Sequence, residues 1–161
     1  VAPGHGAEIV AQYPTASYGS AQAAAVAAFT DAGFTCPARR VARAFAAADQ
    51  PAFLYHFAYD PKGVLFGDLG AFHSAEIRYV LGNPSQLIPN DLTDEEKPLS
   101  AMMMGYWSRF AGTASPNGAG ALAWPKYDAA ADQDLLLDLT PSVESGYRKA
   151  QCDFWDGLQA P

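Results

Sequence analysis

The stretch Phe53-Leu-Tyr-His-Phe-Ala-Tyr59 is the clearest sign of a buried sheet in this chain of 161 residues. Seven aromatic and apolar residues follow one another, and Asp60-Pro61 ends the run. A strand covered on both faces shows such a continuous apolar run, so the stretch predicts a buried strand. A second short apolar run, residues 134–140, predicts another strand just before Pro141.

Helical patterns lie on both sides of these strands. Ser20 to Ala28 is rich in helix formers, and the Thr30–Gly33 segment is a plausible end for that helix. Thr93-Asp-Glu-Glu96 has the form of a capping box and opens the most regular helix, which continues to Gly112. Its apolar residues recur at spacings of three and four and predict a buried face, made of Leu99, Met102, Met103, Tyr106, Trp107 and Phe110.

Two further helices are predicted, one after Cys36-Pro37 and one at the end of the chain. The first is amphipathic and ends before Pro51, with an apolar face formed by Val41, Ala44, Phe45 and Ala48 and an opposite face formed by Arg39, Arg40 and Arg43. The second covers residues 142–158, with inward residues Tyr147, Ala150, Phe154 and Trp155.

Composition and charge exclude several classes of protein. Half of the residues are hydrophobic and 12% are aromatic, enough for a sizeable core in a domain of this length. The sequence has no apolar run long enough to span a membrane. Seventeen acidic residues against ten basic ones, with no basic cluster, argue against binding to nucleic acid. Two cysteines are too few for a zinc site, and on their spacing alone Cys36 and Cys152 are as consistent with free thiols as with a disulfide.

Three histidines are the candidates for proton transfer near neutral pH. His5 lies in an N-terminal segment expected to fray, and His56 lies inside the predicted strand, where a structural role is favoured. His73 follows a segment with glycines at 63, 67 and 70, which predicts a loop. A histidine on a loop held by a packed scaffold is well placed at the mouth of a site. No Gly-x-Ser-x-Gly motif is present, so a complete Ser-His-acid triad cannot be assembled from these residues.

Four blocks of sequence resemble the C-terminal third of a type B carboxylesterase, the carboxylesterase and cholinesterase family of α/β-hydrolases. Their order and spacing match the family, and Trp124–Tyr127 and Cys152–Trp155 extend the agreement to the end of the chain. The blocks are residues 34–40, residues 53–57, residues 70–82 and residues 104–117. The resemblance implies that residues 1–161 form the C-terminal portion of one α/β-hydrolase domain, with the last strands of a mixed, mainly parallel sheet and its covering helices.

The family pattern H-G-x-E-I-x-[YF]-V-[FL]-G falls on residues 73–82 and implies that His73 is the catalytic histidine. Ser74 stands where the family usually has Gly. Glu76 matches a Glu of the pattern that looks structural, so we do not assign it as the acid of the triad. The resemblance also implies a disulfide between Cys36 and Cys152, which suggests a secreted or periplasmic protein. It implies no metal and no organic cofactor.

In this family the nucleophilic serine, the glutamate and the oxyanion loop precede the histidine by long stretches. The resemblance therefore implies an esterase acting by Ser-His-Glu acyl transfer, with His73 from this chain and the rest from an N-terminal remainder of the same enzyme. The chain alone is not expected to be active. A non-catalytic, cholinesterase-like recognition or adhesion domain is the main alternative, and a free-standing binding module is a second. A homodimer through the C-terminal helix is a further expectation, whereas the identity of the ester substrate is beyond this chain.

Overall fold

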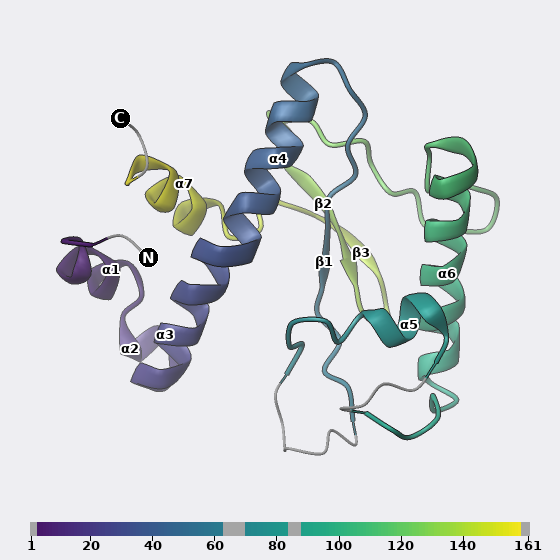
Figure 1. Cartoon of the computed structure of the whole chain (residues 1–161), viewed down its shortest axis with the longest axis horizontal. Helices are drawn as coiled ribbons and strands as arrows, with labels where there is room; N and C mark the ends of the chain where they lie inside the picture. The colour runs from purple at the N-terminus through teal and green to yellow at the C-terminus, as the bar shows by residue number, and fades with distance from the viewer. Residues whose placement is uncertain (1–2, 63–69, 84–87, 159–161) are drawn as a thin grey trace. The chain divides into compact units, whose positions relative to one another are not determined.

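A computed structural model describes residues 3–62, 70–83 and 88–158 of the chain (Figure 1). The chain divides into two compact units. Unit 1 comprises residues 1–54, 127–132 and 145–161, and unit 2 comprises residues 55–126 and 133–144. Two positions of the predicted glycine-rich loop, Gly63 and Gly67, lie outside the described residues.

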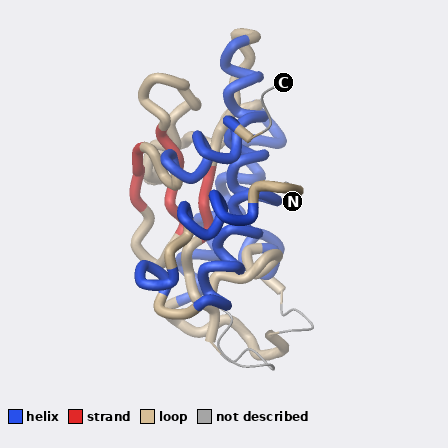
Figure 2. The backbone as a smooth tube through the Cα atoms, turned by 90° about the vertical axis from the view of Figure 1, so that its left-hand side faces the viewer, coloured by secondary structure: helices blue, strands red, loops and turns tan. Residues whose placement is uncertain are grey.

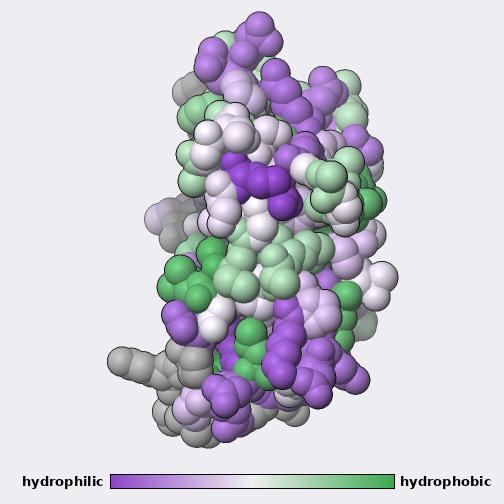
Figure 3. All heavy atoms as spheres, turned by 90° about the vertical axis from the view of Figure 1, so that its right-hand side faces the viewer, coloured by the Kyte–Doolittle hydropathy of each residue, from purple (hydrophilic) through white to green (hydrophobic). Residues whose placement is uncertain are grey.

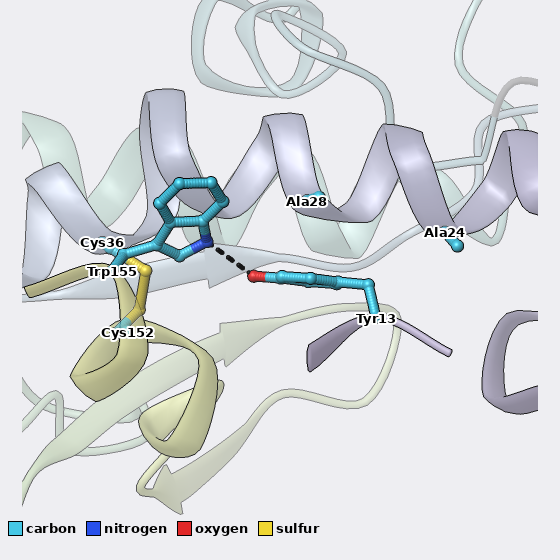
Figure 4. Packing of buried hydrophobic residues seen from close by; sticks show 6 residues of the cluster. All are labelled: Tyr13, Ala24, Ala28, Cys36, Cys152 and Trp155. Atoms are coloured by element: carbon cyan, nitrogen blue, oxygen red, sulfur yellow. Dashed lines mark hydrogen bonds between the residues drawn. A yellow bond between two sulfur atoms is a disulfide. The ribbon is translucent and has the colours of Figure 1, made fainter. Parts of the chain in front are cut away.

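Unit 1 is helical and is tied together by a disulfide. Its core contains Cys36 and Cys152, which are fully buried and bonded to each other, beside the equally buried Trp155. The indole Nε1 of Trp155 donates a hydrogen bond of 2.7 Å to the hydroxyl of Tyr13 (Figure 4). The helices of this unit are α1 (Gly6–Gln12), α2 (Thr15–Tyr18), α3 (Ala21–Thr30), the π-helical turn η1 (Asp31–Thr35), α4 (Cys36–Ala47) and α7 (Lys149–Gly157). The disulfide thus joins the first residue of α4 to the C-terminal helix.

The predicted helix after residue 20 is confirmed, but it does not end where the sequence suggests. The Ser20 side chain accepts a hydrogen bond of 3.0 Å from the N–H of Ala23, which is the N-cap arrangement. Through η1 the backbone then continues without a break into α4, and Asp31 within η1 is buried. Asp31 accepts hydrogen bonds from Tyr13 and from the guanidinium of Arg148, which also lies over the Tyr13 ring. These contacts hold the Thr30–Gly33 segment in a helical path although it has the composition of a helix end.

The amphipathic helix α4 packs through its arginine face. Arg39 is only 3% exposed, and its Nε donates a hydrogen bond of 2.9 Å to Oδ1 of the buried Asp132. Arg40 also forms an ion pair, with Asp156 of α7. In contrast, Val41 and Phe45 on the apolar face are 57% and 49% exposed. The periodicity predicted the two faces correctly, but the buried face of α4 in this unit is the charged one.

Unit 2 contains a three-stranded sheet, whose strands are red in Figure 2. The strand order is β1, β2, β3. Strand β1 (Tyr55–Phe57) and strand β2 (Gln133–Leu137) are parallel, with Tyr55 opposite Leu135. Both predicted strands are therefore confirmed, at shorter lengths. The residues of β1 are half-buried rather than fully buried, because in the described part of the chain only one of its edges is paired, with β2.

Two helices lie against each other in the same unit: α5 (Ile77–Leu81) and the long α6 (Glu96–Thr113). The capping box at the start of α6 is confirmed in both directions. The N–H of Thr93 donates to Oε2 of Glu96 at 2.8 Å, and the N–H of Glu96 donates to Oγ1 of Thr93 at 3.3 Å. Leu99, Met103 and Tyr106 are buried as predicted, whereas Phe110 is 48% exposed.

The C-terminal helix is shorter than the sequence predicts. Strand β3 (Ser142–Ser145) occupies the first part of the predicted range, and α7 begins only at Lys149. Gly146 and Arg148 both have positive φ angles, of 70° and 52°, which turn the chain between the two elements. Within α7 Trp155 is buried as predicted, but Ala150 is exposed.

Candidate functional site

His73 lies in a tight turn at the entry to α5, and its side chain is exposed. The N–H of Ala75 donates to the carbonyl of Phe72 at 3.0 Å, so the turn consists of residues 72–75 with His73 and Ser74 at its centre. Ser74 has a φ of 73°, which matches the third residue of a type II turn. Glycine is the residue favoured there, because other residues rarely adopt the left-handed region. The turn therefore explains why the family pattern has Gly after the histidine.

The turn continues directly into helix α5. The N–H of Ile77 donates to the carbonyl of Ser74 at 3.3 Å, and the N–H of Tyr79 donates to the carbonyl of Glu76 at 3.0 Å. Tyr79 is fully buried, whereas Ile77 is 48% exposed. His73 is thus attached, within a few residues, to a helix with one face fixed in the core of unit 2.

Buried polar contacts fix α5 from its inner side. The Tyr79 hydroxyl donates a hydrogen bond of 2.6 Å to Oε1 of Glu96, and Oγ of Ser100 donates one of 2.7 Å to the carbonyl of Tyr79. Arg78 is 2% exposed, and its Nη2 donates to the carbonyl of Asn90 at 3.0 Å. Sequence analysis identified Glu96 only as half of a capping box. Its contact with Tyr79 gives no signal in the local sequence, because the two residues lie on different helices.

Glu76 lies close enough to β1 to act on a neighbouring tyrosine. The pKa of Tyr55 is raised, first because its hydroxyl is removed from water and second because the negative charge of Glu76 is nearby. The Tyr55 ring packs edge-to-face against Trp107 and Trp124, at centroid distances of 5.2 and 5.9 Å. Glu76 is half-buried, and its structural role stays a prediction.

The other two histidines lie in different surroundings. His5 precedes α1, and its Nδ1 contacts Oε2 of Glu8 at 2.9 Å. The predicted fraying of this segment stays a prediction. His56 is half-buried on β1, opposite Leu136 of β2, which agrees with a structural role.

Exposed hydrophobic side chains occur on the same unit as His73. Two of them, Ile77 and Leu81, lie one turn apart on α5 and are 48% and 61% exposed. Met104 of α6 is 38% exposed, and its Sδ lies 3.2 Å from the point where a Cβ on Gly82 would stand. Figure 3 shows hydrophobic patches among hydrophilic residues on the side of the molecule that carries α6. The helix that follows His73 therefore carries exposed apolar side chains, those of Ile77 and Leu81.

In the part of the chain that the structure describes, no group of three or more His, Cys, Asp or Glu side chains is arranged to hold a metal ion. No helix among the described residues is long and apolar enough to cross a membrane.

Comparison with known proteins identifies the family of this chain. Residues 5–155 match the model of the carboxylesterase family. The chain belongs to the carboxylesterase family. The match includes His73, its turn, α5 and both cysteines of the disulfide, and it establishes the fold as that of an α/β-hydrolase, of which the three-stranded sheet and its helices are a part.

Curated relatives agree with the assignment to the carboxylesterase family. The chain is 37% identical over 141 residues to carboxylesterase 5A of Felis catus, which covers 81% of the chain and 25% of that protein. It is 34% identical over 125 residues to the medium-chain fatty acyl-CoA hydrolase precursor of Anas platyrhynchos and 36% identical over 125 residues to the acylcarnitine hydrolase of Rattus norvegicus. Each of these two matches covers 76% of the chain and 22% of the relative. The chain thus spans about a quarter or less of the length of these relatives.

Proposed function

We propose that this chain supplies the catalytic histidine, His73, of a carboxylic ester hydrolase. The observation that carries the proposal is the position of His73: its side chain is exposed, in a turn that leads into a helix fixed by buried hydrogen bonds. General-base catalysis needs an imidazole that a reacting hydroxyl can approach and that is held in one place. The family match supports the proposal, because the matched region, residues 5–155, contains His73.

The proposed reaction is a two-step acyl transfer. An imidazole nitrogen of His73 takes the proton from a serine hydroxyl as the serine oxygen attacks the ester carbonyl. The same proton then passes to the oxygen of the leaving alcohol, which leaves an acyl-enzyme. In the second step His73 takes a proton from water as the water oxygen attacks the acyl carbonyl, and it then gives that proton to the serine oxygen, whose bond to the acyl carbon breaks, so that the carboxylic acid and the free serine are released.

The serine, the acidic partner of the histidine and the oxyanion donors are proposed to lie in an N-terminal remainder of the same enzyme. This N-terminal remainder is supported by the length of the curated relatives, which are about four times longer than the region that matches this chain. A disulfide that closes a long loop is typical of oxidising compartments, so we propose a secreted or periplasmic enzyme. The substrate is a small-molecule ester, and a homodimer through α7 stays a prediction.

The proposal is tested on the complete enzyme, encoded by the full reading frame that contains this chain. Its hydrolysis of p-nitrophenyl acetate is compared with that of His73→Ala, for which we expect a loss of kcat of at least about 1,000-fold. His5→Ala is the matched control, because it removes the same imidazole from another accessible position, where it contacts Glu8. Near-full turnover by His73→Ala would remove the proposal. A reading frame without Gly-x-Ser-x-Gly would favour the non-catalytic recognition domain instead.

A further inference from the structure

Glu96 is a nearly fully buried carboxylate, 2% exposed, at the first turn of α6. Oε1 accepts the hydrogen bond from the Tyr79 hydroxyl at 2.6 Å, and Oε2 accepts the one from the Thr93 N–H at 2.8 Å. Each carboxylate oxygen therefore accepts a hydrogen bond. A capping box needs only the contact with Thr93, so the contact with Tyr79 is additional to helix capping.

The electrostatics keep this carboxylate ionised inside the unit. Burial acts to raise the pKa of Glu96, but the hydrogen bonds from Tyr79 and Thr93 and the positive charge of Arg78 outweigh it, so the pKa lies below its usual value. A hydrogen bond to an ionised acceptor is stronger than one between neutral groups. The same carboxylate, together with burial as the larger cause, raises the pKa of Tyr59 to about 12. Glu96 is thus an ionised centre to which Tyr79 is firmly bonded.

Helix α5 depends on such outside contacts. It has five residues, and so short a helix is not stable by itself in water. Tyr79 is its most constrained residue: the hydroxyl is bonded to Glu96, the carbonyl accepts from Ser100, and the ring packs against Phe57 at 5.5 Å. The N–H of Tyr79 donates to the carbonyl of Glu76, and the N–H of Ile77, the next residue, donates to the carbonyl of Ser74 in the turn that holds His73.

We propose that Glu96, acting through the Tyr79 hydroxyl, is a positioning residue for His73. The contact fixes the inner face of α5 to the N-terminus of α6 and thereby fixes the turn from which the imidazole projects. This inference rests on the proposed function, in which His73 is the catalytic base. A small displacement of a catalytic group lowers the rate of the chemical step more than it lowers substrate binding.

The test removes one oxygen atom from the complete enzyme. Tyr79→Phe keeps the ring that packs against Phe57 and Tyr59 but loses the hydrogen bond to Glu96. We expect kcat for p-nitrophenyl acetate to fall about 10-fold, with KM changed by less than about twofold. The matched control is Tyr106→Phe. Its side chain is also fully buried in unit 2, and its hydroxyl donates a hydrogen bond of 2.7 Å to the carbonyl of Leu122. This hydrogen bond involves neither Glu96 nor α5.

A second variant tests the carboxylate itself and guards against a folding defect. Glu96→Gln has the same shape and an amide oxygen that can still accept from Tyr79, so we expect it to retain more kcat than Tyr79→Phe. Folded enzyme is counted in each sample from its thermal transition. The positioning role of Glu96 is overturned if Tyr79→Phe leaves kcat unchanged, or if Tyr106→Phe lowers kcat as much as Tyr79→Phe does. If His73→Ala is inactive in the same experiment, the proposed function still stands. If His73→Ala is active, both proposals fail.

Discussion

Ser74→Gly is expected to stabilise the chain although it removes a side chain. Ser74 has a φ of 73° beside His73, and the left-handed region costs a residue with a Cβ roughly 1–2 kcal/mol. Glycine avoids this cost, but it also makes the unfolded chain more flexible, and the extra entropy of the unfolded state reduces the stabilisation by about 0.4–1 kcal/mol. The net gain in the free energy of unfolding is therefore about 0.5–1 kcal/mol. For a folded unit of 161 residues such a gain raises Tm by about 1–4 °C, and the shift is smaller in the longer, complete enzyme.

The assay is thermal unfolding followed by circular dichroism, with urea unfolding as a second measurement of the free energy of unfolding. Ser74→Ala is the matched control: alanine keeps the Cβ and hence the backbone strain, so its Tm should not rise. The turn at residues 72–75 would have to be reconsidered if Ser74→Gly lowered Tm, or if Ser74→Ala raised it as much as the glycine variant. Either result would mean that the positive φ angle at Ser74 is not a source of strain.

Two further predictions concern unit 1. The bridge between Cys36 and Cys152 closes a loop of 116 residues, and chain entropy predicts that replacing both cysteines with Ser lowers the free energy of unfolding, measured in urea, by about 5 kcal/mol. Mass spectrometry of a digest made without reducing agent should find the two cysteine peptides joined, and finding both as free thiols would contradict the bridge. Burial acts to raise the pKa of Asp132, but the hydrogen bonds from Arg39 and Tyr127 outweigh burial and lower that pKa. The ionised Asp132 therefore contributes fully to the free energy of unfolding above the ordinary Asp pKa of about 3.9, and this contribution is lost as the pH falls through the lowered pKa. Tm should thus be nearly constant from pH 7 to about 5 and fall below about pH 4, and Asp132→Asn should have a lower Tm at pH 7 but a shallower acid dependence; equal acid dependence in both proteins would contradict this role of Asp132.

Local chemistry made several features of the fold predictable from the sequence. The contacts of Ser20 with Ala23 and of Thr93 with Glu96 join residues three positions apart, so their side chains indicate the helix starts directly. The two strands were predictable because a run of apolar residues bounded by proline has few other structures available. In the candidate site, the glycines before His73 predicted a loop, and Gly63 and Gly67 of that loop lie outside the described residues; the turn that holds His73 is made by residues 72–75, with the positive φ at Ser74.

The features that sequence analysis missed depend on partners far along the chain. Arg39 is buried because Asp132 accepts from its guanidinium, and nothing near Arg39 indicates that partner. Asp31 holds the chain helical through η1 because Arg148, near the start of α7, binds its carboxylate. The bond between Tyr79 and Glu96 is of the same kind. Periodicity predicts which residues share a face, but only the tertiary partners decide which face is buried.

The parallel pairing of β1 with β2 has a consequence for how the protein is made. Tyr55 lies opposite Leu135, so all of α5, α6 and the His73 turn belong to the connection between the two strands. Pairings between residues so distant in sequence form slowly, because a long loop must be closed before any contact compensates for its entropy. On the ribosome, β1 must wait as an apolar segment until β2 has been synthesised. The histidine therefore reaches its final surroundings late in folding, and β1 is the segment that most needs protection from aggregation during that delay.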